Sequence, residues 1–143
     1  MAEDVSTDDL FVRMYAVHHR VLVDLESVAA FDEWSPFELL AMRVFALAGH
    51  AIGAIDIAKA LGCSFPYASR LSKKLQARGF VGEFRWHQYR SLSMTIDGAE
   101  WVRAELYNLT HFTTVLFGDL TPEERNQLFQ LLGRVKRSAP CQE

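Results

Sequence analysis

The sequence has 143 residues, half of them apolar and 23% charged, with a net charge of −3, which is typical of one globular domain and excludes a disordered chain. Its two cysteines are too few for a disulfide framework or a cysteine zinc site, and the four acids among the first ten residues, with no Lys or Arg, exclude a signal peptide. The longest weakly polar run, residues 44–55, is too short to cross a membrane, so we expect a cytoplasmic protein with no membrane partner.

The first half of the chain predicts two long helices. Apolar residues at three- and four-residue spacing mark the first one: Leu10, Met14, Val17, Val21, Leu25 and Val28. The second runs from Pro36 to about Ala48, with Ser35 as its N-cap. Glu38 is placed to complete a capping box, and Gly49 ends the helix.

A helix-turn-helix follows. A short helix over Ala54–Leu61 is ended by Gly62, and a fourth helix runs from Phe65 to Arg78 with Ser64 as its N-cap. The two helices and the short turn between them have the spacing of a helix-turn-helix.

The rest of the chain predicts a hairpin and two more helices. One strand covers 80–86, and the alternating Ser91–Ile96 segment is the other, with Leu92, Met94 and Ile96 on one face and a turn over 87–89. A long helix spans Asp97–Phe117 with Thr95 near its N-cap, and residues 121–124 open the last helix with a capping box. That helix carries an apolar stripe: Leu128, Phe129, Leu131, Leu132 and Val135. The fold class is mainly α with a small β-hairpin wing, a winged helix-turn-helix.

Basic residues are concentrated around the fourth helix. Residues 61–90 contain six Lys or Arg and one acid, whereas residues 1–60 contain four and ten. On a helical wheel one side carries Ala68, Leu71, Ser72 and Leu75, and the other carries Pro66, Ser69, Arg70, Lys73, Lys74 and Ala77. A face with cations, small residues and no acid favours entry into the major groove of DNA. The alternative is a basic face that is merely solvated.

Four segments in this order resemble the MarR (multiple antibiotic resistance regulator) family of winged helix-turn-helix transcription factors. They are residues 55–62 (IDIAKALG), 69–81 (SRLSKKLQARGFV), 95–98 (TIDG) and 120–124 (LTPEE). The resemblance covers roughly residues 8–137. It implies the fold and DNA-binding function of that family.

The resemblance implies a homodimer on a pseudo-palindromic operator in double-stranded DNA, with half-sites about 34–36 Å apart. It divides the chain into an N-terminal dimerisation helix (1–34), a winged helix-turn-helix lobe (35–96), and C-terminal dimerisation helices with a tail (97–143). Part of each apolar stripe on the terminal helices must also serve the core of one chain. The candidate DNA contacts are Ser64, Pro66, Tyr67, Ser69, Arg70, Lys73, Lys74, Arg85 and Arg90. Packing against the hairpin is the alternative for Tyr67.

Many members of that family are released from DNA by a small aromatic ligand, bound between the dimer helices and the DNA-binding lobe. The candidate ligand residues here are Tyr15, His18, His19, Arg43, His50 and Trp101. A purely structural role is the alternative for each of them.

The wing departs from the family pattern. It is shorter, and residues 85–90 (RWHQYR) lack the family's Asp. Arg85 or Arg90 could still reach a narrow minor groove. We expect Trp86 and Tyr89 to fold back onto the hairpin as core, with stacking on DNA sugars or a protein contact as the alternatives.

No other chemistry is indicated. We expect Cys63 to be a buried thiol, with an oxidisable thiol at a helix start as the alternative, and Cys141 to have no role. The histidines have no ligand spacing, and no catalytic motif is present, so we expect no metal, no cofactor and no enzymatic activity. The predicted function is a dimeric DNA-binding transcriptional regulator, a repressor modulated by a small molecule. The alternative is a winged-helix protein-interaction module without specific DNA binding that uses its aromatic wing.

Overall fold

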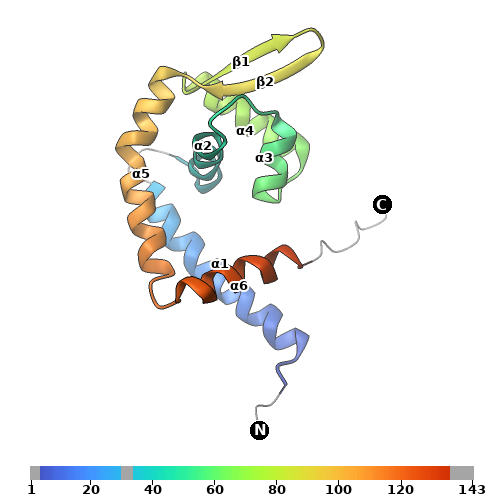
Figure 1. Ribbon diagram of the computed structural model, residues 1–143, viewed down its shortest axis with the longest axis vertical. Helices are drawn as coiled ribbons and strands as arrows, with labels where there is room; N and C mark the ends of the chain where they lie inside the picture. The colour runs from blue at the N-terminus through green and yellow to red at the C-terminus, as the bar shows by residue number, and fades with distance from the viewer. Residues whose placement is uncertain (1–3, 30–33, 136–143) are drawn as a thin grey trace. The chain divides into compact units, whose positions relative to one another are not determined.

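The computed structural model describes residues 4–29 and 34–135. Its elements are helices α1 (Thr7–Ala29), α2 (Pro36–Ala48), α3 (Ala54–Leu61) and α4 (Phe65–Ala77), strands β1 (Val81–Trp86) and β2 (Tyr89–Met94), and helices α5 (Ile96–Leu116) and α6 (Pro122–Gly133) (Figure 1). The elements expected from the sequence are present in the expected order. The described residues form two compact units, which divide after position 106.

The helix N-termini are capped by the residues that the sequence indicates. The hydroxyl of Ser35 accepts a hydrogen bond from the Glu38 N–H at 3.2 Å, and that of Ser64 accepts from the Tyr67 N–H at 3.3 Å. At α6 the Thr121 hydroxyl accepts from the Glu124 N–H at 3.1 Å, and the Glu124 carboxylate accepts from the Thr121 N–H at 3.4 Å. These bonds satisfy N–H groups that have no partner within the helix.

The capping-box prediction for Glu38 is wrong. Its backbone N–H is capped by Ser35, but its carboxylate faces Lys74 and Arg78 of the α4 region. Two cations attract a carboxylate more strongly than one backbone N–H does, so the side chain turns away from its own helix end.

One hydrophobic core holds the first unit together. Side chains from α2, α3, α4 and the base of the hairpin meet in it, with Trp34 before α2 and Val102 on α5. The buried members are Trp34, Ala41, Met42, Phe45, Ile52, Ile57, Ala58, Ala68, Leu71, Leu75, Val81, Leu92 and Val102. This packing fixes α4 against α2 and α3, with one face inward and the other in solvent.

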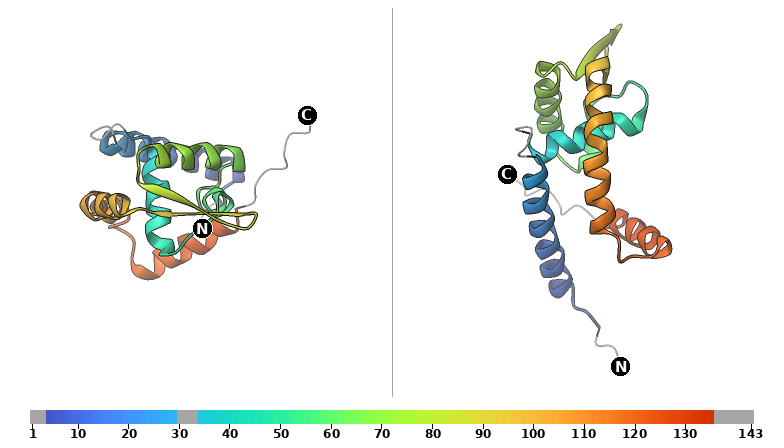
Figure 2. Two further views of the ribbon diagram at one scale, coloured as in Figure 1. Left: turned by 90° about the horizontal axis from the view of Figure 1, so that it is seen from above. Right: turned by 90° about the vertical axis from the view of Figure 1, so that its left-hand side faces the viewer.

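The hairpin is joined to the helical part at its base. Strands β1 and β2 are antiparallel, with Val81 opposite Met94 and Trp86 opposite Tyr89. Ile52, in the loop between α2 and α3, exchanges two backbone hydrogen bonds of 2.8 and 2.7 Å with Leu92. The turn of the hairpin is its far end from α5 (Figures 1 and 2), and Trp86 and Tyr89 are the last pair before that turn. Tyr89 thus belongs to β2 and not to the turn, where it was expected.

The 95–98 segment forms the junction between the hairpin and α5. The Thr95 hydroxyl donates to the Gly79 carbonyl at 2.6 Å and accepts from the Gly98 N–H at 3.0 Å, which confirms its capping role. Gly98 lies so close to the Phe80 carbonyl that a Cβ would overlap it. Ile96 was expected in the strand, on one face with Leu92 and Met94, but it begins α5 and is 80% exposed, because Thr95 caps the helix there.

The terminal helices keep much of their apolar surface exposed within one chain. On α1, Leu25 is buried, whereas Leu10, Met14 and Val17 are exposed, and the side chain of Val28 lies outside the described part. The α6 stripe is largely in solvent, with Phe129 76% exposed. Val135 was assigned to that stripe but lies beyond the end of the helix. Within 4–29 and 34–135, no helix combines the length and apolar character needed to span a bilayer.

Candidate nucleic-acid interface

Helix α4 has the two faces that the helical wheel predicts. Ala68, Leu71, Ser72 and Leu75 are buried, and the Ser72 hydroxyl donates to the Ala68 carbonyl at 2.8 Å, so this polar group is satisfied in the core. The opposite face is open to solvent apart from Ser69, which is half-buried; it comprises Pro66, Ser69, Arg70, Lys73, Lys74 and Ala77. The α3–α4 pair therefore presents a basic, acid-free helix face on a packed scaffold.

The N-terminal turn of α4 places Tyr67 beside α2. Its ring packs edge-on against Phe37 with centroids 5.5 Å apart, and the Arg70 guanidinium lies 5.9 Å from its centroid. The structure thus places Tyr67 against α2, an arrangement that the two sequence alternatives did not include. Because the ring is held on one side and 36% exposed, it supports Arg70 from the flank of the exposed face.

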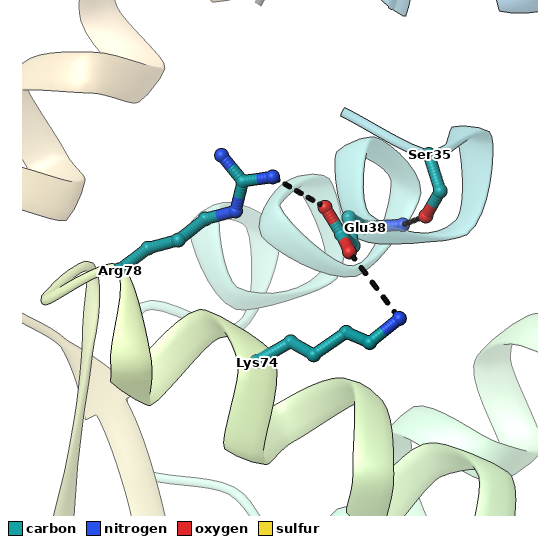
Figure 3. A network of polar contacts seen from close by, with 4 residues as sticks. All are labelled: Ser35, Glu38, Lys74 and Arg78. Atoms are coloured by element: carbon teal, nitrogen blue, oxygen red, sulfur yellow. Dashed lines mark hydrogen bonds and ion pairs between the residues drawn. The ribbon is translucent and has the colours of Figure 1, made fainter. Parts of the chain in front are cut away.

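The four cations of residues 65–78 fall into two pairs. In the described part of the chain, Arg70 and Lys73 make no ion pair. Lys74 Nζ lies 4.0 Å from Glu38 Oε1, and an Arg78 terminal nitrogen donates to Glu38 Oε2 at 3.2 Å (Figure 3). Arg70 and Lys73 are therefore the cations that are most available to a polyanion.

The wing arginines share one acid. Arg85 and Arg90 lie directly opposite each other in the hairpin, and both approach Glu83 Oε1, at 3.5 and 2.9 Å. Like charges opposite each other destabilise a strand pair, and Glu83 offsets that repulsion. Glu83 was not among the site residues predicted from the sequence; the signal for it was the period of two that places Glu83 and Arg85 on one strand face.

The prediction that Trp86 and Tyr89 fold back as core is wrong. They face each other across the hairpin end and are 75% and 68% exposed. The core reaches the hairpin only at its base, through Val81 and Leu92. Alternation places Phe84 on the same face as Trp86, and its ring is exposed too, so the outer face of the wing is aromatic.

An aromatic cluster that was not predicted from the sequence joins Trp34, Phe80 and Trp101. The indole of Trp34 stacks on that of Trp101 with centroids 4.3 Å apart, and Phe80 packs against both. The Arg78 guanidinium lies 4.4 Å from the Trp34 ring centroid. These residues come from three separate segments of the chain, so no local motif could reveal them.

The candidate ligand residues are scattered. Tyr15 and His18 are in ring contact, with centroids 6.2 Å apart, on the exposed face of α1. Trp101 belongs to the aromatic cluster, Arg43 is half-buried on α2, and the exposed His50 ring has Nδ1 2.9 Å from the Ala51 carbonyl oxygen. His19 is exposed on α1. These six residues lie on α1, on α2 and the loop after it, and on α5.

A cavity of about 220 Å³ lies elsewhere, between α3, α4 and the hairpin. Lys73, Glu83 and Arg90 are among its lining residues, so it borders the candidate DNA-binding face. None of the six candidate ligand residues lines it.

Cys63 is half-buried and packs against the core, and Cys141 lies outside the described residues. In the described part of the chain, no group of three or more His, Cys, Asp or Glu residues could hold a metal ion.

Comparison with solved structures identifies the fold. No protein-family model and no curated protein matches the sequence. The structure is similar to a MarR/EmrR-family transcriptional regulator from an Acinetobacter species (TM-score 0.78, 16% identity, 91% of this chain and 94% of that one). It is also similar to BpsR of Bordetella bronchiseptica, whose DNA binding is regulated by 6-hydroxynicotinic acid (0.74, 15%, 94% and 100%), and to S. aureus MepR, solved as a DNA complex (0.71, 20%, 93% and 96%). The winged-helix fold of the MarR-family regulators, implied by the sequence resemblance, is thereby confirmed.

Proposed function

We propose that this chain, which has the fold of the MarR-family regulators, is a DNA-binding transcriptional regulator and not an enzyme. The observation that carries the proposal is the exposed face of α4, where Arg70 and Lys73 stand without an acid partner among the described residues. Arginine and lysine at such a position bind guanine edges and phosphates. The TM-score of 0.71 to MepR, solved with DNA, supports the same use of the fold.

The DNA contacts that we propose come from α4 and the wing. Arg70 is the base-reading residue, with Pro66 and Ser69 at the closest approach to the groove. Ser64 and Tyr67 contact the backbone at the start of the helix, and Lys73 contacts a phosphate. Arg85 and Arg90 on the wing enter the minor groove. In the free protein Glu83 pairs with both arginines and offsets their repulsion, and in the complex DNA phosphates take over that pairing.

We further propose that two copies of the chain form the active species. Phe129 of α6 and the exposed apolar residues of α1 are large hydrophobic side chains that a single chain leaves in water. A second copy would cover them, and its own α4 would read the other half-site of a pseudo-palindromic operator.

Repression and its release by a small aromatic ligand complete the proposal. BpsR, which shares the fold, is regulated by 6-hydroxynicotinic acid, a small aromatic acid. Such a ligand would bind beside the candidate residues of α1, α2 and α5. We place the protein in the cytoplasm, where its DNA is.

The test is a mobility-shift titration against DNA flanking the protein's own gene, at two salt concentrations and with random duplex as competitor. We expect tight binding that resists the competitor and weakens steeply with salt. If ligand-stripped protein binds neither this DNA nor any sequence selected from the whole genome, the proposal fails.

The exposed wing aromatics favour a second candidate function. Trp86, Tyr89 and Phe84 are exposed aromatic residues on one face of the hairpin, which suits a protein partner in a winged-helix module that lacks specific DNA binding. Such a module would show little affinity for duplex DNA even at low salt, so the same titration separates the two.

A further inference from the structure

The carboxylate of Glu38, on α2, is buried and faces α4, the helix that contacts DNA in the proposed function. Among the described residues, Glu38 is the one charged residue that is buried, and its side chain is only 6% exposed. It stands in the first turn of α2, whose N-terminus Ser35 caps (Figure 3). A buried carboxylate is costly unless it has charged or hydrogen-bonding partners, so its partners are held to it in turn.

Both partners of Glu38 come from the α4 region, and they are held differently. Arg78 binds one carboxylate oxygen at 3.2 Å and its side chain is 33% exposed. Its guanidinium also lies over the Trp34 indole, so it is held by both the carboxylate and the ring. Lys74 lies 4.0 Å from the other oxygen and is 69% exposed, so it reaches back to the acid from the solvent side. Figure 3 shows the Lys74 side chain on α4 and the Arg78 side chain at the end of that helix, both pointing towards the same carboxylate.

Lys73 and Lys74 are neighbours in sequence with different surroundings. Lys73 is exposed and makes no ion pair in the part of the chain that the structure describes, whereas Lys74 faces Glu38. From the sequence alone, both lysines are expected to contact DNA. In the structure, the Glu38 carboxylate competes with any DNA phosphate for the Lys74 ammonium group.

We propose that Glu38 is a specificity-determining positioning residue of the DNA interface. It retains Lys74 and Arg78 on the protein side, so that the attraction of α4 for phosphates comes from Arg70 and Lys73. Binding to random DNA stays weak, and base contacts from Arg70 take a larger share of binding to the operator. This inference rests on the proposed function and replaces the sequence expectation that Lys74 contacts DNA.

The first test compares two single variants on random duplex DNA. Lys73→Ala should flatten the plot of log affinity against log salt by about 0.9 units, the value for one lost phosphate contact. Lys74→Ala should flatten it by less than about a third of that. Both positions are exposed on a helix, where alanine is well tolerated.

The second test removes the charge that retains Lys74. Glu38→Gln keeps the shape of the side chain and should steepen the salt plot by about 0.9 units, which is about a threefold to fourfold change in relative affinity between 50 and 200 mM salt. Adding Lys74→Ala to this variant should return the wild-type slope. Glu100→Gln, an exposed acid on α5 with no ion pair among the described residues, makes the same change in net charge and should leave the slope unchanged.

The fold of Glu38→Gln is checked by its near-ultraviolet circular dichroism, because the stacked indoles of Trp34 and Trp101 report on the neighbouring packing. If that variant does not fold, the comparison of Lys73→Ala with Lys74→Ala decides alone. Equal flattening by those two variants would overturn the role of Glu38 and leave the proposed function standing. A wild-type protein with no salt-dependent affinity for DNA would overturn both.

Discussion

Gly98 shows how one residue without a side chain fixes the junction between the wing and α5. Any Cβ there would overlap the Phe80 carbonyl. The carbonyl of the preceding residue, Gly79, accepts a hydrogen bond from the Thr95 hydroxyl. We expect Gly98→Ala to lower the free energy of unfolding by about 1–3 kcal/mol, the usual cost of forcing atoms into a packed site. Urea denaturation measures it. Gly133→Ala, at the end of α6 where a Cβ meets nothing, is the matched control and should be neutral or slightly stabilising.

Arg70 is the residue whose loss should affect specificity most. It is exposed on α4 and is supported from the side by the Tyr67 ring. If it contacts a guanine edge, Arg70→Ala should weaken operator binding by about 1–3 kcal/mol and affect random duplex much less. The measurement is a competition titration with both DNAs. An equal loss on both would make Arg70 a phosphate contact instead.

At the scale of the elements, the hairpin has a packed base and an exposed end, and Trp86 lies at the exposed end. Trp86→Ala should change the free energy of unfolding by no more than about 0.5 kcal/mol, because its ring is in solvent. Trp34→Ala should cost about 3–5 kcal/mol, because Trp34 is buried between Phe80 and Trp101. Thermal or urea unfolding of the two variants tests the contrast. A large loss for Trp86→Ala would mean that the wing end is packed after all.

For the whole molecule, the proposed dimer depends on the exposed apolar faces of the terminal helices. Placing a charge on the exposed apolar face of α6, as in Phe129→Asp, should shift the protein to the mass of one chain and weaken operator binding, because a charge buried in an interface costs several kcal/mol. Sedimentation equilibrium measures the mass. Gln130→Asp adds the same charge at the next exposed position and should have a smaller effect. If both variants and the wild type sediment as single chains, a dimer built on α6 is excluded.

The sequence by itself determined the local architecture. Periodicity and caps such as Ser35, Ser64 and Thr121 placed the helices correctly, because these signals act between residues three or four positions apart. The same spacing separated the buried and exposed faces of α4, and with them the basic surface. Tertiary structure decided which cations remain free and where the aromatics lie. Glu38 meets Arg78 across 40 positions, and Trp34 meets Trp101 across more than half the described chain. No local pattern encodes such contacts, since buried charges and rings take their partners from whatever the fold brings beside them.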